Sequence, residues 1–331
     1  MIPRMSDNIS VVSRSPGLES AAVEIVVTVP TFKRPEHLLA TLASLRAQVT
    51  ERRFAVIVME NEADDRAGAK AAAPLFESGE TQGLLIIAHE RGNCAAYNAG
   101  WLTALVHFPD FRHLMVIDDD ELADPYWIER MATAAEMLDA DIVGGPQVPV
   151  FEKPEQAHWA AHPVFRPPYP ETGLVDALYS SGNLLIRRSV LERMGPPFLD
   201  LRFNFMGGGD SDFLSRSKAE GFSLAWCSEA PVHETIPSRR LESDWIRARS
   251  IRNGVISTLV EKRKRMDDPM GRVKVIMKSA LLLAASPFRG VAAWMRSGSL
   301  STGLYPVFVG IGRIIAEFGY TNEQYRHADK N

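Results

Sequence analysis

Short runs of β-branched and aliphatic residues alternate with longer stretches of helical periodicity over the first half of the chain. This alternation is typical of buried parallel strands joined by helices. The predicted strands are Val23–Val29, Phe54–Met59, Leu84–Ala88, Leu114–Ile117 and Asp141–Val143. The predicted helices are Glu36–Gln48, Asn93–Phe108 and Pro125–Leu138. The pattern predicts an α/β fold with a mostly parallel central sheet and flanking helices.

Polar residues follow the ends of these predicted strands. Thr31 and Arg34 come after the first strand, Glu60 after the second, Arg91 after the third, and the acidic run Asp118–Glu121 after the fourth. The carboxyl ends of parallel strands meet at one edge of an open α/β sheet, and ligands bind there. We therefore expect these residues to lie around one ligand site.

The acidic run Asp118–Glu121 has two interpretations. Crowded carboxylates raise one another's pKa unless a cation neutralises them, and a divalent ion held with a diphosphate would do so. The alternative is a solvated loop leading to a helix, since Asp124 before Pro125 is a natural helix cap. The position of the run directly after a buried strand favours the ligand site.

The second half of the chain carries another candidate carboxylate. Three glycines at 207–209 precede Asp210, which begins a predicted helix containing Phe213 and Leu214. A carboxylate at a helix N-terminus is stabilised by the helix dipole and is available as a general base. Taken alone, simple helix capping by Asp210 or Asp212 explains this pattern better.

The order of the motifs changes that balance. The motifs are Val29–Arg34, Glu60, Asn93–Gly100, Asp118–Asp120, Ser181–Arg188 and Gly208–Phe213. Together they resemble family 2 glycosyltransferases of the GT-A fold, over roughly residues 23–240. Each motif is weak alone, but six in the expected order are specific. The family usually has Asp at the position of Glu60, and Glu-Asp at Gly209-Asp210.

The resemblance implies a role for each candidate residue. The donor-binding residues would be Thr31, Arg34, Glu60, Arg91, Asp118 and Asp119. Asp120 would bind Mg²⁺ or Mn²⁺ bridging the diphosphate, and His233 would complete that metal site. Asp210 would deprotonate the acceptor hydroxyl, and Asp212 would orient the base or bind the acceptor. The alternative for His233 is an ordinary surface loop between two prolines.

The resemblance also implies a domain division and a reaction. Residues 23–145 would bind the nucleotide-sugar and 146–240 the acceptor. The reaction would be inverting transfer from a nucleotide-sugar, expected to be a UDP-sugar, to a glycan or polyprenyl-diphosphate-linked oligosaccharide. A weaker resemblance, to bacterial exopolysaccharide enzymes of the succinoglycan type, favours a single addition, because the Gln-x-x-Arg-Trp motif of processive synthases is absent.

Three other functions stay open from the residues alone. A phosphatase of the haloacid dehalogenase type has Asp-x-Asp after a strand but expects Thr or Val where Leu122 stands. A sugar nucleotidyltransferase expects a glycine-rich loop where residues 30–35 have no glycine. A non-catalytic carbohydrate-binding protein would not need Asp118, Asp120 and Asp210 together.

Composition adds the cellular context. The 331 residues are 46% hydrophobic and 24% charged, as in ordinary globular proteins, and the net charge of −4 argues against a nucleic-acid binder. Two cysteines are too few for a disulfide framework, which favours a cytoplasmic protein. Residues 1–22 are expected to form a flexible tail. No uninterrupted run of apolar residues predicts a membrane span.

The C-terminal region, residues 241–331, is predicted to be a helical, basic and amphipathic extension. Residues 239–278 hold twelve Lys or Arg against five Asp or Glu, a local net charge of +7. Apolar stretches follow at Val275–Pro287 and Leu304–Phe318, with Phe288 and Trp294 between them. This combination suits peripheral contact with the anionic inner face of the cell membrane. The alternative is a helical cap with a solvated basic face.

Overall fold

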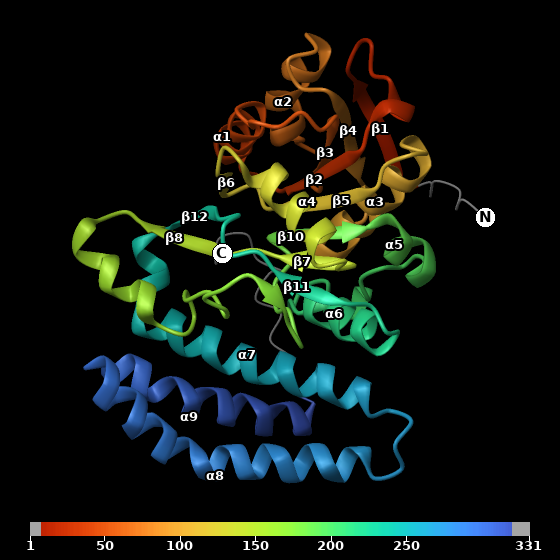
Figure 1. Cartoon of the computed structure of the whole chain (residues 1–331). Coiled ribbons are helices and arrows are strands. Elements are labelled where there is room, and N and C mark those ends of the chain that lie inside the picture. The colour runs from red at the N-terminus through yellow and green to blue at the C-terminus, as the bar shows by residue number, and fades with distance from the viewer. Residues whose placement is uncertain (1–7, 320–331) are drawn as a thin grey trace. The chain divides into compact units, whose positions relative to one another are not determined.

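The structure, a computed structural model that describes residues 8–319, divides into two compact units (Figure 1). The first comprises residues 8–147 and 169–234, and the second comprises residues 148–168 and 235–319. The segment 148–168 therefore belongs with the C-terminal helices, whereas the sequence placed it in an acceptor half at 146–240. The outermost parts of the predicted tail and extension, 1–7 and 320–331, lie outside the described residues.

The sheet of the first unit is built around four parallel strands. They are β2 (Ile25–Thr31), β3 (Phe54–Glu60), β4 (Gly83–Ala88) and β5 (His113–Ile117), in the spatial order β4-β3-β2-β5. The helices that follow these strands are α1 (Pro35–Arg46), α2 (Ala67–Glu77), α3 (Asn93–His107) and, after β5, α4 (Trp127–Met137). The four predicted strands are confirmed. Because the strand order reverses between β2 and β5, their loops flank the point where such sheets bind ligands.

The other half of the sheet is mixed. Strand β10 (Asn183–Arg187) lies antiparallel between β5 and β7 (Ile142–Gly144), and β11 (Leu224–Trp226) runs parallel to β7. The short strand β9 (Gly173–Leu174) closes that edge. Helices α5 (Arg188–Met194) and α6 (Gly209–Ala219) follow β10 in the chain. The sheet is thus parallel only over β4-β3-β2-β5 and in the β7–β11 pair.

The expectation of a flexible tail before Val23 is wrong for the residues that the structure describes there. Strand β1 (Ile9–Arg14) pairs antiparallel with β4 and forms the opposite edge, and a single turn, η1 (Ser20–Ala22), follows. Val11 and Val12 are exposed on this strand, which also carries Ser and Arg. Polar and charged residues are usual on edge strands, so composition alone made this segment look unstructured.

The second unit is mainly helical. Its elements are β8 (Gln147–Phe151), whose first residue is counted with the first unit, η2 (Pro154–Ala161), η4 (Ser238–Leu241), α7 (Ser243–Lys264), α8 (Gly271–Ser297), α9 (Leu300–Ile315) and η5 (Ala316–Phe318). The predicted C-terminal helices are present. Figure 1 shows α7, α9 and α8 lying side by side, with α9 in the middle.

Glycines allow α9 to pack closely on its neighbours. A Cβ atom on Gly312 would lie 2.0 Å from the carbonyl oxygen of Ile251 in α7, and one on Gly290 of α8 would lie 2.4 Å from that of Gly303. Arg313, which is buried, then joins the three helices through hydrogen bonds to Glu261 at 2.7 Å and to two serines, Ser257 and Ser279. The buried charge is paired, as it must be away from water.

Helix α8 bears on the expectation that no segment spans a membrane. It is long and apolar enough to cross a membrane by length and composition, with an 18-residue window of mean hydropathy 1.3. The sequence did not suggest a span because no uninterrupted apolar run is present. Length and composition do not by themselves distinguish a spanning helix from one that lies on a surface.

We predict that Gly312→Ala destabilises the second unit. The added methyl group would meet the backbone of Ile251, which cannot rotate away as a side chain can, so the free energy of unfolding should fall by about 1–3 kcal/mol. A lowered urea midpoint measures this. Gly173→Ala is the matched control, because no atom lies within 4 Å of its Cβ position. Equal midpoints for the two variants would contradict the close packing.

Candidate active site

Two loops meet where the strand order reverses. The hydroxyl of Thr31, at the end of β2, donates a hydrogen bond to the carboxylate of Asp119 at 2.8 Å. Arg34, in the same loop, donates to Asp120 at 2.8 Å and to Asp119 at 3.4 Å. Thr41 of α1 donates to the backbone carbonyl of Asp119 at 2.9 Å. The basic loop after β2 therefore holds the acidic loop after β5 in a fixed position.

The carboxylates of the acidic loop are hard to ionise together. Burial raises the pKa of Asp118 to about 7, and the neighbouring Asp120 adds to the shift. Burial also raises the pKa of Asp119 to about 7, although the Arg34 guanidinium opposes the rise. Positive charge from a ligand would relieve this crowding. The crowding expected from the sequence is thus present in the structure.

Glu121 is a member of the site to which the sequence analysis gave no role. Its buried carboxylate accepts a hydrogen bond from the backbone N–H of Asp118 at 2.9 Å and another from the side-chain amide of Gln147. Burial, with Asp118 and Glu234 nearby, holds its pKa well above the usual value. A Cβ on Gly182 would lie 2.7 Å from this carboxylate, so a larger residue there would displace the side chains around it. The signal in the sequence that could have identified Glu121 is its place at the end of the acidic run.

The two residues predicted to bind a metal, Asp120 and His233, lie on different elements of the structure. The carboxylate of Asp120 contacts Arg34, while His233 lies in β12 (Val232–Ile236), opposite Leu122 in the ladder with β6 (Glu121–Ala123). Among residues 8–319, no group of three or more His, Cys, Asp or Glu has the geometry to hold a metal. Mg²⁺ commonly takes only one or two protein carboxylates and completes its shell with phosphates and water. The oxygen donors of the acidic loop fit that kind of site.

Glu60 occupies a fully buried position. Its two carboxylate oxygens accept hydrogen bonds from the backbone N–H groups of Glu62 and Ala69, each at 2.9 Å. Burial raises its pKa, and these backbone donors oppose the rise. A Cβ on Gly68 would lie 2.8 Å from the carboxylate, so the start of α2 closes over it. In this structure Glu60 fixes the loop after β3.

Arg91 lies close to the same region. Its guanidinium is 5.0 Å from the centroid of the Phe32 ring, in the loop after β2. Asn61 bonds the loop that carries Arg91, donating to the carbonyl of Glu90 at 2.8 Å and accepting from the N–H of Gly92 at 2.7 Å. Asn61 was missed, because an amide after a strand gives no chemical signal of its own. The loops after three neighbouring strands are thus joined.

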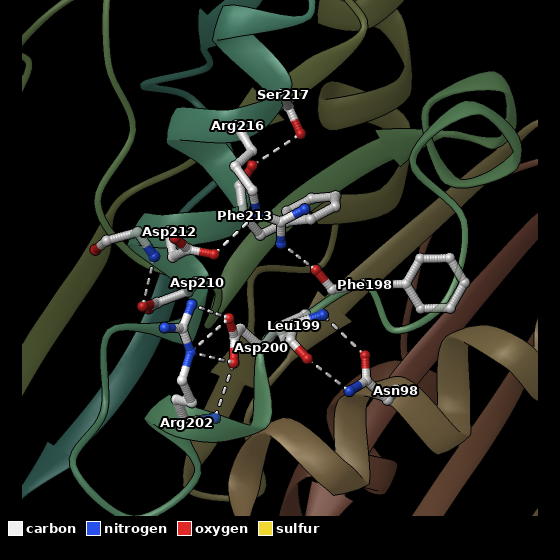
Figure 2. A network of polar contacts seen from close by, with 11 residues as sticks. Asn98, Phe198, Leu199, Asp200, Arg202, Asp210, Asp212, Phe213, Arg216 and Ser217 are labelled. Carbon is white, nitrogen blue, oxygen red and sulfur yellow. Dashed lines mark hydrogen bonds and ion pairs between the residues drawn. The ribbon is translucent and has the colours of Figure 1, made fainter. Parts of the chain in front are cut away.

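Asp210 stands at the start of α6, after Gly207 and Gly208, whose positive φ angles of 78° and 96° suit glycine. Figure 2 shows Asp210 and Asp212 on this helix, with Arg216 of the same helix reaching Asp212. Asp212 is only 1% exposed and accepts from Arg216 at 2.9 Å. Arg216 also donates to the carbonyl of Phe198. The carboxylate of Asp212 is therefore buried and already engaged by a side chain of its own helix.

One turn of α3 touches both halves of the candidate site. The hydroxyl of Tyr97 donates a hydrogen bond to Asp118 in the acidic loop. Three residues earlier, Cys94 packs beneath α6, where a Cβ on Gly209 would lie 2.5 Å from its sulfur. Burial raises the pKa of the Cys94 thiol, which suits a packing role. Residues three apart lie on one helix face, so this turn of α3 contacts both the acidic loop and the start of α6.

This arrangement defines a class of protein. The large central sheet with its flanking helices is that of a GT-A glycosyltransferase. The chain belongs to the family described as "Glycosyl transferase family 2", because the model of that family matches residues 26–195. The predicted fold and the predicted enzyme class are confirmed.

Individual relatives agree with this assignment. The chain is 30% identical over 245 residues to the succinoglycan biosynthesis protein ExoM of Rhizobium meliloti (strain 1021), covering 72% of this chain and 75% of that protein. Crystal structures of S. aureus TarS 1-349 with UDP and with UDP-GlcNAc match with TM-scores of 0.53 and 0.51, at 12% identity, over 90% of this chain and 91% of those. The TarS similarity shows the fold.

We predict that Tyr97→Phe shifts the pH dependence of activity. The Tyr97 hydrogen bond lowers the pKa of Asp118, so its loss should raise that pKa above about 7. If ionised Asp118 is needed for donor binding, the acid limb of the kcat/KM profile moves to higher pH. Tyr126→Phe is the control, since Tyr126 is exposed. Superimposable pH profiles for Tyr97→Phe and wild type would refute a role for this hydrogen bond.

Proposed function

We propose that the protein transfers a single sugar from a UDP-sugar to a hydroxyl of a polyprenyl-diphosphate-linked oligosaccharide, with inversion, in exopolysaccharide assembly. The observation that carries the proposal is the contact of one turn of α3 with both the acidic loop and the start of α6. A relative named for succinoglycan biosynthesis supports the pathway, and the TarS structures with UDP and UDP-GlcNAc support the donor.

The donor would be held by the loops at the strand ends. Thr31, Arg34 and Arg91 would contact the nucleoside and diphosphate, with Glu60 fixing the loop beneath them. Asp118 and Asp119 would face the ribose and sugar. Asp120, with His233 as a further ligand, would hold Mg²⁺ or Mn²⁺, which supplies positive charge to the departing diphosphate. Arg34 already contacts Asp120 and would share the neutralisation of that charge.

Asp210 would act as the general base. Its carboxylate accepts the proton of the acceptor hydroxyl as the hydroxyl oxygen forms its bond to the anomeric carbon. The bond from that carbon to the diphosphate breaks in the same displacement, UDP leaves with the electron pair, and the configuration inverts. Asp212, held by Arg216, would keep the first turn of α6 in place. A lipid-linked acceptor would place the enzyme on the inner face of the cell membrane.

We predict that Asp120→Asn abolishes metal-dependent donor binding while the protein stays folded, because its side chain lies in a partly exposed loop. Isothermal titration calorimetry with UDP, with and without Mn²⁺, measures the loss. Asp110→Asn, in an exposed turn, is the matched control. Unchanged UDP affinity in the presence of Mn²⁺ would remove Asp120 from the metal site.

We predict that Asp210→Asn retains UDP binding but loses sugar transfer by about 10²–10⁴-fold, the usual contribution of a general base. Transfer is measured as radiolabelled sugar moved from the donor to a lipid-linked acceptor fraction. Asp212→Asn should lower thermal stability as well as activity, because it breaks the pair with Arg216. An inactive Asp212→Asn beside an active Asp210→Asn would exchange the two roles.

A further inference from the structure

Helix α8 has an unusual distribution of side chains. The residues it buries are Gly271, Val275, Ser279, Ser286 and Gly290, so four of five are glycine or serine. Large apolar residues are exposed instead, with Phe288 at 80% and Leu281 at 67%. A surface helix of a water-soluble protein buries its large apolar residues. Helices that face lipid pack through small residues and place large ones outward.

The exposed apolar residues form one continuous stripe. The outer α8 face is defined here as Met277, Leu281, Phe288, Val291, Trp294 and Met295. At about 100° per residue these six positions fall within about 140° of the helix circumference. Lys274, Lys278, Arg289 and Arg296 follow along one side of that stripe. An apolar stripe with aromatic residues and bordering cations is the pattern of a helix that lies in a membrane interface.

The cations that border this face differ in whether an acidic residue pairs with them. Between Gly271 and Ala316 the sequence contains no Asp or Glu, whereas it contains six Lys or Arg, at 272, 274, 278, 289, 296 and 313. The basic cluster at 262–265 that first suggested a membrane contact is partly engaged within the unit. Lys262 pairs with Glu317 at 2.8 Å, and Arg265 pairs with Glu261 at 3.5 Å. On α8, Lys274 pairs with Asp268 at 2.6 Å and Lys278 with Glu261 at 2.9 Å, whereas Arg289 and Arg296 have no acidic partner among residues 8–319. These two arginines, beside the apolar stripe, move the candidate contact from the end of α7 to α8.

The spacing of charges favours a helix that lies on the bilayer over one that crosses it. The stretch between Lys278 and Arg289 has only ten residues, and a span needs about 20 apolar residues. The buried side of α8 also packs against α9, where Gly290 meets Gly303. Crossing would carry Lys278 or Arg289 into the hydrocarbon layer.

We propose that the outer α8 face inserts into the headgroup and upper acyl region of an anionic phospholipid bilayer, with the side chains of Arg289 and Arg296 on lipid phosphates. This inference rests on the membrane-bound acceptor of the proposed function and identifies the surface that meets the membrane. The occupant is lipid because the face combines bulky apolar side chains with Arg289 and Arg296 at its border.

Vesicle flotation of the full chain tests the proposal. The wild type should float with vesicles of equal phosphatidylglycerol and phosphatidylcholine, and dissociate as salt rises. Phe288→Ser with Trp294→Ser should weaken binding about 100-fold. Met137→Ser is the matched control, because Met137 is 81% exposed on α4. Undiminished binding of the double variant would overturn the proposal.

The charges are tested separately. Arg289→Gln with Arg296→Gln should weaken binding about 30-fold, because each cation near an anionic surface raises the binding constant about fivefold. The control is Arg46→Gln with Arg53→Gln, two exposed arginines of the first unit. Equal wild-type binding to pure phosphatidylcholine, or no binding to anionic vesicles, would overturn the proposal. UDP titration of every variant separates this failure from failure of the proposed function, since donor binding should not change.

The depth of insertion gives an independent readout. Lipids brominated near the headgroup should quench tryptophan fluorescence of the wild type, and Trp294→Phe should remove most of that quenching. Protein that resists extraction by alkaline carbonate would show a crossing helix and overturn the interfacial arrangement. A dimer in sedimentation that Phe288→Ser makes monomeric, with vesicle binding unchanged, would assign the face to a second copy of the chain.

Discussion

The hydrogen-bonded pairing of Arg34 with the acidic loop is the interaction on which the active site depends. Three aspartates follow a fully buried strand, and burial already raises the pKa of Asp118 and Asp119 to about 7. Arg34 reaches both Asp119 and Asp120 from the neighbouring loop and supplies one of the positive charges they need. The carboxylates that remain crowded favour binding of a cationic group. The crowding that raises the pKa of these aspartates therefore also prepares the loop for a ligand.

The sheet topology explains why this pairing is available. Strands β2 and β5 are adjacent and parallel, so the loops that follow them leave the sheet at the same edge. Thr31 and Thr41 then fix the acidic loop from one side, and Tyr97 fixes it from helix α3. A rigid acidic loop has its charges oriented before a ligand arrives, which reduces the cost of ordering them during the reaction.

The sequence predicted what depends on local pattern and missed what depends on tertiary partners. Four buried parallel strands and the acidic loop were predictable, because apolar runs ending in carboxylates are visible in the chain. The edge strand Ile9–Arg14 was missed because its pairing with β4 comes from residues about 75 positions away. Glu60 was predictable as a site residue. Its burial and its hydrogen bond from a backbone N–H of α2 were not predictable, because they depend on how α2 folds back onto the strand end. The inward serines and glycines of α8 likewise become visible only when α9 is in place.

The membrane contact proposed for the second unit would solve a physical problem that the proposed acceptor poses. A glycosyl acceptor carried on a polyprenyl chain diffuses in two dimensions, so an enzyme in bulk solution meets it rarely. Small residues let α7, α8 and α9 pack backbone to backbone, and Arg313 satisfies its charge inside that packing. Because Leu281 and Phe288 stay exposed while the helices pack, these side chains would be available to contact lipid. One short segment of chain can therefore combine stable helix packing with an outer face suited to the proposed contact with lipid.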